Sequence, residues 1–305
     1  MNTGSKTLDP KKVPFGITPT LWWNDDFPSI DIGVTFGECV SEMALAGFVG
    51  CSVGHKYPTD PKVLKPALEL RGLRVSEPWV STYFTIKEMK QRTLHTFHQQ
   101  MKFLKEMGAT DMVVAEFGQA VNPLPAVSIF ANRPIFTDHQ WSELLNGLEE
   151  LGRLSNDNGL RLCYHPHMGT GVMIEEDVDR LMENTNPDLV HLLLDTGHLA
   201  FAGADPLRVT RKYGRRIKHI HLKDVRADVV TRVHKEHLSF YDAIEAGVFT
   251  VPGDGAIDFV PIFAALAEAD FEGWLVIEAE QDPAKANPLK YAKMARSYLH
   301  ETLGW

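Results

Sequence analysis

Eight short runs of β-forming residues recur along the chain, and each is followed by a longer segment with helical periodicity. This alternation is typical of βα units arranged around a parallel sheet. A chain of 305 residues has room for a closed (β/α)8 barrel, a fold that commonly spans about 250 residues or more as one unit. The expected strands are residues 15–18, 48–53, 73–77, 112–116, 160–165, 190–195, 217–221 and 275–278.

The sequence therefore predicts the α/β class, with a single (β/α)8 TIM barrel over residues 1–305. The last four expected strands are almost continuous apolar runs, which is typical of strands that are covered on both faces. Residues 1–13 are expected to form a flexible tail. Residues 288–303 have the pattern of a final amphipathic helix.

Composition and charge argue against several functional classes. Hydrophobic residues make up 44% of the chain and charged residues 23%, so a full-sized apolar core can form. The formal net charge of -9 would repel a phosphate backbone, so nucleic acid is not an expected partner. No stretch approaches the roughly 20 apolar residues of a membrane span, and the first residues lack the apolar core of a secretion signal. We therefore expect a cytoplasmic protein without a membrane partner.

Several common catalytic motifs are absent from the sequence. There is no glycine-rich dinucleotide fingerprint, no Walker loop and no nucleophile elbow. Cys39, Cys51 and Cys163 are far apart in apolar segments, as reduced and buried thiols usually are, so we expect neither a disulfide nor a catalytic thiol.

Two connections are longer than the short loops of a compact barrel. Residues 118–137 are rich in proline and asparagine, and residues 225–257 include the tight segment Pro252-Gly253-Asp254-Gly255. Both follow strands, so we expect two long loops on the rim that carries the active site in barrels of this kind.

Four consecutive expected strands end in a side chain that can bind a metal ion. The carboxyl ends of barrel strands converge on one rim, so these side chains are expected to meet. Two imidazoles and two carboxylates favour Mn, Co, Fe or Zn over Ca or Mg. Six-coordination would leave positions for substrate oxygens. The four expected ligands are His165, Asp195, His221 and Glu278.

Each expected ligand also has a structural alternative. A histidine at a strand end, such as His165, is as often a hydrogen-bonded structural residue as a ligand. Asp195 and Glu278 each close an apolar run, where a charge needs a partner to offset its desolvation. Either a metal ion or an arginine would serve as that partner.

Other imidazoles lie close to the same strand ends. His167 follows His165, and His198 follows Asp195; both are expected beside the metal, in contact with the substrate or with a carboxylate. His219 shares a face with His221 but lies one layer deeper, where a buried, hydrogen-bonded histidine is the simpler interpretation.

Charged and aromatic residues on this rim are further candidates. Lys223 and Arg226 follow the seventh strand and are expected to project into the cavity mouth, where a cation can polarise a carbonyl or bind hydroxyls; solvated surface charge is the alternative. An aromatic side chain beside carboxylates resembles a sugar-stacking wall, with core packing as its alternative. The candidate catalytic residues are Glu278, His198, His167 and Lys223, and the candidate substrate-binding residues are Glu116, His55, Arg226 and Trp79.

Three motifs resemble those of the xylose-isomerase-like TIM barrels, and they recur in the same order along the whole chain. They are Leu194-Asp195-Thr196-Gly197-His198, the segment from His219 to Arg226, and Val276-Ile277-Glu278. Within that superfamily the chain is most similar to the inosose dehydratases of inositol catabolism. The residues that carry this second resemblance are Gly16-Ile17-Thr18-Pro19, the segment from Tyr164 to Thr170 and the segment from Gly253 to Phe259.

This resemblance implies a hydro-lyase that removes water from a keto-inositol and forms a trihydroxycyclohexane-dione. It implies Mn or Co as the divalent metal, and reduced glutathione is sometimes associated with the activity. The metal would bind the ketone and a neighbouring hydroxyl; Glu278, His167 or His198 would remove the adjacent proton, and a protonated group near Lys223 would help the hydroxyl leave. Barrels of this kind are often dimers or tetramers, so a homo-oligomer is expected.

Other functions stay open at this point. A ketose or keto-inositol epimerase or isomerase would use the same metal and return the proton to carbon instead of losing water. His165 stands where many superfamily members have Glu, which argues against a two-carboxylate proton shuttle. A sugar-binding barrel without catalysis is a second alternative, and an abasic-site endonuclease is a third that the acidic balance disfavours.

Overall fold

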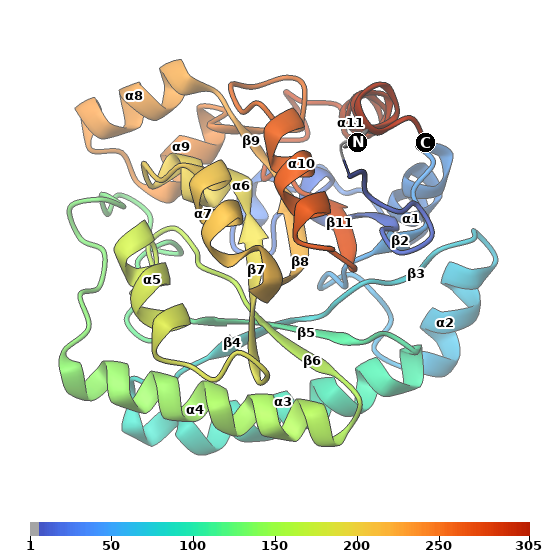
Figure 1. Ribbon diagram of the computed structural model, residues 1–305. Coiled ribbons are helices and arrows are strands. Elements are labelled where there is room, and N and C mark those ends of the chain that lie inside the picture. Colours follow the sequence, from blue (N-terminus) through green and yellow to red (C-terminus); the bar gives the residue numbers. More distant parts are fainter. Residues whose placement is uncertain (1–5) are drawn as a thin grey trace, which may run out of the picture.

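Nine parallel strands form one curled sheet in the computed structural model, which describes residues 6–305 (Figure 1). The order of the strands in the sheet is β3-β2-β1-β11-β8-β7-β6-β5-β4. Their bounds are β1 (Phe15–Ile17), β2 (Gly50–Cys51), β3 (Arg74–Val75), β4 (Trp79–Thr82), β5 (Asp111–Glu116), β6 (Arg161–Tyr164), β7 (Val190–Asp195), β8 (Ile217–Leu222) and β11 (Trp274–Ile277).

The barrel closes through a strand that is split in two. β3 pairs with β2 and β4 pairs with β5, and only residues 76–78 separate β3 from β4. Since these two strands stand at opposite ends of the sheet order, the chain itself joins the ends. Backbone hydrogen bonds from Ser76 N to Cys51 O (2.9 Å) and from Val53 N to Glu77 O (3.2 Å) extend the pairing beyond β3. The predicted barrel is thus confirmed, with a third strand that runs on to Thr82.

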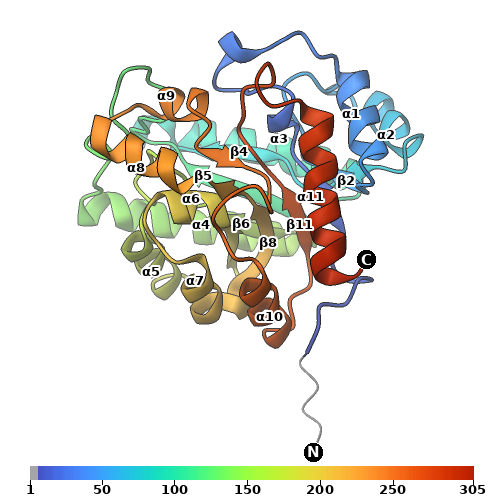
Figure 2. The same cartoon turned by 90° about the horizontal axis from the view of Figure 1, so that it is seen from above.

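Helices surround the sheet on its outer side, as in the expected βα units (Figures 1 and 2). Their apolar stripes face the strands; in α4, for example, Leu144, Leu148 and Leu151 are fully buried. Within residues 6–305, no helix is both long and apolar enough to cross a membrane. The outer helices are α1 (Phe36–Leu45), α2 (Pro61–Glu69), α3 (Lys90–Met107), α4 (Asp138–Asp157), α5 (Glu175–Glu183), α7 (Pro206–Tyr213), α10 (Val260–Glu268) and α11 (Pro288–Leu303), with short 3-10 turns at η1 (Pro19–Leu21), η2 (Pro28–Ile30), η3 (Lys87–Met89) and η4 (Gly214–Arg216).

The connection at residues 225–257 is not the loop that the sequence predicted. It contains α8 (Ala227–Glu236), α9 (Phe240–Glu245) and the second strand of a small antiparallel pair, β9 (Asp224–Val225) with β10 (Phe249–Thr250). Its apolar residues bury a second, smaller core on the rim, because they meet apolar side chains from α6 (Thr196–Phe201) and from the loop at 118–137. We call this the rim core; it includes Ile129, Phe201, Val233, Phe240 and Phe249.

The other long connection, residues 118–137, is a loop as predicted. It lies beside α8 and α9 in both views (Figures 1 and 2). A β-bridge joins Ser128 to Ser239, and Ile129 N donates to Leu238 O at 3.2 Å. The two long connections therefore hold one another in place over one part of the rim.

Residues 6–13, which were expected to belong to a flexible tail, pack against the barrel; residues 1–5 lie outside the described part. Leu8 and Val13 are buried in the main core. Lys12 O accepts a hydrogen bond from Gly273 N at 3.2 Å, next to the start of β11. Apolar side chains at these two positions anchor this segment to the barrel, so the expectation of a flexible tail is wrong for residues 6–13.

Two helical glycines test how tightly the outer helices are packed. A Cβ at Gly152 in α4 would lie 2.6 Å from the carbonyl oxygen of Leu189, whereas a Cβ at Gly37 in α1 would meet nothing within 4 Å. We expect Gly152→Ala to lower the free energy of unfolding by about 1–3 kcal/mol, because the backbone of a neighbouring turn must move. Gly37→Ala, the control, should leave it unchanged or raise it by up to about 1 kcal/mol. Urea unfolding followed by tryptophan fluorescence measures both, and equal shifts would contradict the packing described for α4.

Candidate metal centre

A cavity of about 380 Å³ opens at the carboxyl ends of the strands. This volume is in the range of sites for small molecules. One part of the lining is apolar and includes Pro19, Val53, Trp79, Val113, Phe117 and Pro123. The other part is acidic and includes Asp25, Asp26, Glu77, Glu278 and Glu280. No lysine or arginine is among the described residues that line this cavity.

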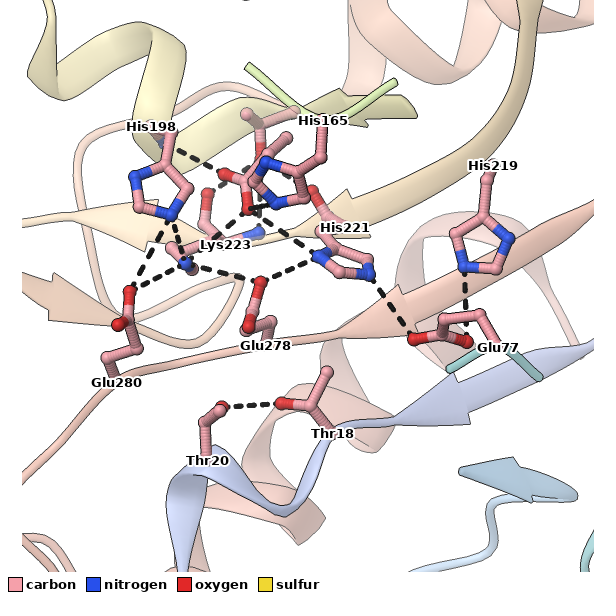
Figure 3. A network of polar contacts seen from close by, with 12 residues as sticks. Thr18, Thr20, Glu77, His165, His198, His219, His221, Lys223, Glu278 and Glu280 are labelled. Atoms are coloured by element: carbon pink, nitrogen blue, oxygen red, sulfur yellow. Dashed lines mark hydrogen bonds and ion pairs between the residues drawn. The ribbon is translucent and has the colours of Figure 1, made fainter. Parts of the chain in front are cut away.

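The four strand-end side chains that were expected to meet do lie together, and two of them, His221 and Glu278, line the cavity. His165, Asp195, His221 and Glu278 each offer one ligand atom, and these atoms lie within 4.8 Å of one another. All four side chains are buried, and they come from the ends of β6, β7, β8 and β11. Figure 3 labels three of them, His165, His221 and Glu278. The convergence of strand ends thus assembles a group of two imidazoles and two carboxylates that could hold a metal ion.

Hydrogen bonds outside the group fix which nitrogen of each imidazole faces the centre. His165 donates from Nδ1 to the carbonyl oxygen of Pro166 at 2.8 Å, so its Nε2 is the free nitrogen and lies 3.4 Å from Asp195 Oδ2. His221 Nε2 lies 3.4 Å from Glu77 Oε1, which leaves Nδ1 facing Glu278 Oε2 at 2.7 Å. A carbonyl or carboxylate behind the imidazole is the usual support of a metal-binding histidine.

The polar atoms at the centre fit a bound cation. Asp195 Oδ2, His221 Nδ1 and Glu278 Oε2 are buried and form no hydrogen bond of normal geometry, although charged groups lie 2.7–3.7 Å from them. Unpaired buried polar atoms are unfavourable, and a shared cation would satisfy all three. Metal bonds of about 2.0–2.2 Å place ligands on a common ion roughly 3 Å apart, and the pairs above are separated by 2.7–3.7 Å. These four residues therefore suit a divalent metal.

Neighbouring charges shift the pKa values of His221 and Glu278 in opposite directions. Burial opposes a charged imidazole, but the carboxylates of Glu278 and Glu77 raise the pKa of His221 to about 10. Burial likewise opposes a charged carboxylate, yet Lys223 and His221 hold the pKa of Glu278 well below its ordinary value. A proton on His221 thus occupies the place of a cation, and a metal ion bound through Nδ1 would displace it.

A row of buried charges supports the group from inside the barrel. His219 lies one layer below His221, as predicted, with Nδ1 2.9 Å from Asp111 Oδ2 and Nε2 3.3 Å from Glu77 Oε2. Arg161 pairs with Asp111 at 2.7 Å. Against the effect of burial, His219 and His221 lower the pKa of Glu77 to about 2. Glu77 therefore stays ionised and keeps its hydrogen bond to the back of His221 (Figure 3).

A lysine ammonium lies beside the four side chains and is completely buried. Lys223 Nζ is 2.9 Å from both His198 Nε2 and Glu280 Oε2, 3.2 Å from Glu278 Oε2 and 3.4 Å from Asp195 Oδ2. Burial favours the neutral amine, but the three carboxylates raise the pKa of Lys223 and keep it charged. The expectation that Lys223 projects into the cavity mouth is corrected: it lies behind the carboxylates, because they need a counter-charge where water is excluded.

His198 is a neutral acceptor in this arrangement. An ammonium can only donate, so His198 accepts through Nε2 and carries its proton on Nδ1. Burial, together with His167 and Lys223, lowers the pKa of His198 well below its ordinary value. His198 does not line the cavity. Its contact with the site is made through Lys223 Nζ.

The motif from Asp195 to His198 interlocks with Lys223. Asp195 Oδ1 accepts from His198 N at 2.8 Å and so caps α6, which leaves Oδ2 for the centre. A Cβ at Gly197 would lie 2.4 Å from Lys223 Cγ, so only glycine leaves room for the lysine stem. Thr196 Oγ1 donates to Lys223 O at 2.7 Å. This packing explains why these residue types occur together.

His167 and Trp79 face the cavity, as expected. His167 donates from Nδ1 to Met168 O at 2.9 Å, so its Nε2 is a free acceptor. Burial, helped by His165 and Lys223, lowers the pKa of His167 to about 3 and keeps it neutral. The Trp79 ring packs edge-on against His165 and His167, with centroids 5.3 and 5.8 Å apart. The neutral imidazole and the indole form one wall of the cavity.

Glu280 is a site residue that the sequence analysis missed. It lines the cavity, contacts Lys223 and lies 3.5 Å from Asn24 Nδ2. Burial raises the pKa of Glu280 to about 7; Lys223 opposes this rise and Glu278 adds to it. The signal was present in the spacing Glu278-Ala279-Glu280, because alternate residues of an extended segment share a face. Asn24, Asp25 and Asp26, after β1, carried no comparable pattern.

Three candidate substrate-binding residues do not line the cavity. Glu116 accepts hydrogen bonds from Thr82 Oγ1, Thr85 Oγ1 and three backbone amides, so it organises the loops around it. Arg226 binds the carbonyl oxygens of Gly247 and Phe249 and the side chain of Asp254 in the β9–β10 region. Both side chains point away from the cavity, because each satisfies backbone groups of a connection.

His55 is the third of these residues, and it is half exposed. Its Nδ1 lies 2.5 Å from Asp25 Oδ1, and its backbone N–H donates to Asp25 Oδ2 at 3.2 Å. Asp25 itself lines the cavity. The structure thus gives His55 an indirect position at the site, through the carboxylate that it holds.

Comparison with known proteins identifies similar sequences over nearly the whole chain. A family model described as xylose isomerase-like TIM barrel matches residues 32–301. An inosose dehydratase of Geobacillus thermodenitrificans is 52% identical over 293 residues, which cover 96% of this chain and 98% of that protein. An inosose dehydratase of Clostridium tetani is 51% identical over 290 residues, or 95% of this chain and 97% of that protein.

Solved structures of lower identity share the fold. A structure of L-ribulose 3-epimerase has a TM-score of 0.70 and 17% sequence identity, and the match covers 96% of this chain and 95% of that one. At this identity the similarity concerns the barrel architecture alone.

Glu77 offers a test of how the cation site is supported. Glu77→Gln keeps the size of the side chain and removes the charge behind His221, so we expect divalent-metal affinity to fall by about 10–100-fold. Titration of the metal-free protein with Mn²⁺ in a calorimeter measures the dissociation constant. The matched control is Asp177→Asn, since Asp177 is a half-buried carboxylate that binds Arg133 and the start of α5, and it should leave the affinity unchanged. An unaltered affinity in the Glu77 variant would contradict the supporting role.

Proposed function

This chain belongs to the inosose dehydratase family of the xylose isomerase-like TIM barrels, and from this premise we propose that it removes water from a keto-inositol. The substrate would be 2-keto-myo-inositol and the product a trihydroxycyclohexane-dione, which makes the enzyme a hydro-lyase. The full-length similarity to the two inosose dehydratases carries the proposal. The buried group of His165, Asp195, His221 and Glu278 supports it.

The lining of the cavity favours an uncharged polyol as substrate. Carboxylates such as Asp26 and Glu280 accept hydrogen bonds from hydroxyl groups, and no basic side chain offsets them among the described lining residues. A phosphorylated sugar would meet repulsion there. Trp79 and Phe117 offer apolar surface for the carbon-bound face of a ring. A small ring with many hydroxyls and no charge fits this surface.

We propose Mn or Co as the divalent ion that the four side chains hold. Such an ion supplies Lewis-acid chemistry, because it stabilises the negative charge that develops on the carbonyl oxygen of the substrate. Glu77 and the Pro166 carbonyl keep His221 and His165 in the orientation that binding requires.

Loss of water needs two proton transfers. One proton leaves the carbon next to the ketone, and one proton joins the departing hydroxyl as the carbon–oxygen bond breaks and a carbon–carbon double bond forms. Of the candidate bases, His198 is occupied by Lys223, and Glu278 faces Lys223 and His221. We therefore assign proton removal to His167, whose free Nε2 faces the cavity.

Glu280 is the candidate for the second transfer. It lines the cavity and contacts Lys223, which matches the expectation of a proton donor near that lysine. Asn24 Nδ2, at 3.5 Å from Oε1, holds the other oxygen of its carboxyl group. Both His167 and Glu280 line the cavity and their ligand atoms lie within 4.8 Å of one another, which supports a pair that would act on one bound ring.

Three further expectations from the sequence stay as proposals. They are the choice of Mn or Co, a homo-oligomer with two or four chains, and an effect of reduced glutathione. Each can be measured on the purified protein by metal analysis, by light scattering and by assay with and without glutathione.

Metal removal tests the proposed reaction directly. With 2-keto-myo-inositol and Mn²⁺, we expect an ultraviolet-absorbing dione, a loss of at least about 100-fold in rate after chelation, and recovery when Mn²⁺ is returned. Asp195→Ala should lose metal and activity together, whereas Asp228→Ala on the exposed side of α8 should lose neither. A stereoisomer formed without loss of water would favour an epimerase, and turnover that survives chelation would contradict the role of the metal.

The two imidazoles near Lys223 should respond differently to the same substitution. We expect His167→Gln to lower kcat by about 10²–10⁴-fold, because a general base is lost, and to stop exchange of the substrate C–H with solvent deuterium. His198→Gln should lower kcat less and leave that exchange measurable. His95→Gln on the exposed side of α3, away from the cavity lining, is the control and should change neither. Unchanged deuterium exchange in the His167 variant would exclude His167 as the base.

A further inference from the structure

The buried ammonium of Lys223 stands among atoms that could bind a second cation. His167, His198 and Glu280 form a separate group, and their ligand atoms lie within 4.8 Å of one another. Lys223 Nζ is 2.9 Å from His198 Nε2 and 2.9 Å from Glu280 Oε2. The ammonium therefore contacts two members of a ligand set that is complete without it (Figure 3).

The two groups of ligands are neighbours, because the Lys223 ammonium contacts carboxylates of both. Nζ is also 3.2 Å from Glu278 Oε2 and 3.4 Å from Asp195 Oδ2, which belong to the first group. Carboxylates that face two neighbouring cation positions are typical of two-metal centres, where the ions stand about 3.5–4 Å apart. The chain thus carries side chains for two adjacent cations, and one of the two positions holds an amine.

We propose that Lys223 restricts this centre to a single divalent ion, because its ammonium takes the place of a second one. The inference rests on the proposed function, since it assumes that the first group binds metal. It adds that the second group, His167, His198 and Glu280, is a latent site for a divalent cation.

The balance of charge supports this assignment. Asp195, Glu278 and Glu280, when ionised, contribute one negative charge each, and one divalent ion together with the Lys223 ammonium supplies as many positive charges. A second divalent ion would have to enter beside a cation that is already there. Like charges at such short range, away from water, repel strongly.

Lys223 cannot easily move aside for an ion. Its side chain is completely buried, and its stem passes over Gly197, where a Cβ would lie 2.4 Å away. Thr196 Oγ1 binds its backbone carbonyl at 2.7 Å, and the Phe249 ring centroid lies 4.6 Å from Nζ. The second cation of the centre is therefore part of the polypeptide and does not exchange with solvent.

Removal of the ammonium should make the second position available to metal. Metal-free protein is loaded with excess Mn²⁺, desalted and analysed for metal, and its electron paramagnetic resonance spectrum is recorded. We expect about one Mn²⁺ per chain with an isolated-ion spectrum for the wild type, and about two with a spin-coupled spectrum for Lys223→Ala. Adding His198→Ala to Lys223→Ala removes a ligand of the second ion and should return the count to about one.

Lys212→Ala is the matched control. Lys212 also pairs with two carboxylates, Asp179 at 2.8 Å and Glu183 at 2.9 Å, but it lies on the surface away from the cavity. This variant should keep one ion with an isolated-ion spectrum. A second ion in the control would show that removal of any paired lysine has this effect and would overturn the inference.

The remaining outcomes separate the inference from the function on which it rests. One ion in folded Lys223→Ala, or two ions in the wild type, overturns the role of Lys223 and leaves the proposed dehydratase intact. A wild type that binds no Mn²⁺ overturns the metal centre and the inference with it. Circular dichroism checks folding; if the alanine variant does not fold, Lys223→Met replaces it, since methionine preserves the stem over Gly197, ends one atom short of the ammonium and carries the same expectation.

Discussion

The register between β7 and β8 is the constraint on which the site depends. Leu192 pairs with Ile217, but the next residue, Leu193, pairs with His219, so Lys218 is an extra residue in β8. This irregularity places Asp195 opposite His221; an unbroken register would have placed it opposite Ile220. Since a shift by one residue turns a side chain to the other face of a sheet, the extra residue brings the carboxylate and the imidazole to the same side.

Many charged side chains are buried at the site, and each is stabilised by a neighbour of opposite charge. Positive and negative side chains alternate along the inside of the barrel, in the order Arg161, Asp111, His219 and Glu77. Beside the cavity, the Lys223 ammonium likewise lies next to carboxylates. Removing one member would leave its partner buried without compensation, which is far more unfavourable than removing a pair. Clusters of titratable groups with shifted pKa values are typical of functional sites. Here they surround Asp195 Oδ2, His221 Nδ1 and Glu278 Oε2, which form no hydrogen bond of normal geometry.

The sequence predicted those features that follow from position along a strand. The barrel, the convergence of the four strand ends and the deeper layer of His219 all depend on strand order and alternation, which apolar runs reveal. Side-chain direction in the connections was not accessible: Glu116 and Arg226 follow strands as expected, yet each turns towards backbone groups of a loop. The helices α8 and α9 were missed because their apolar residues bury the rim core and not the main one. The burial of Lys223 required knowledge of three carboxylates that come from distant parts of the chain.

The split third strand gives the barrel a short seam between β2 and β3. β2 and β3 share two paired positions, whereas β7 and β8 share four, and the seam lies where Glu77 and Trp79 enter the cavity. Because this seam has fewer paired positions, transient opening is easier there than along a longer pairing such as that of β7 with β8. Transient opening of this seam would displace the Glu77 carboxylate behind His221 and the Trp79 ring together. Slow backbone motion at the three-residue break between β3 and β4 can therefore affect both metal binding and the entry of the substrate ring.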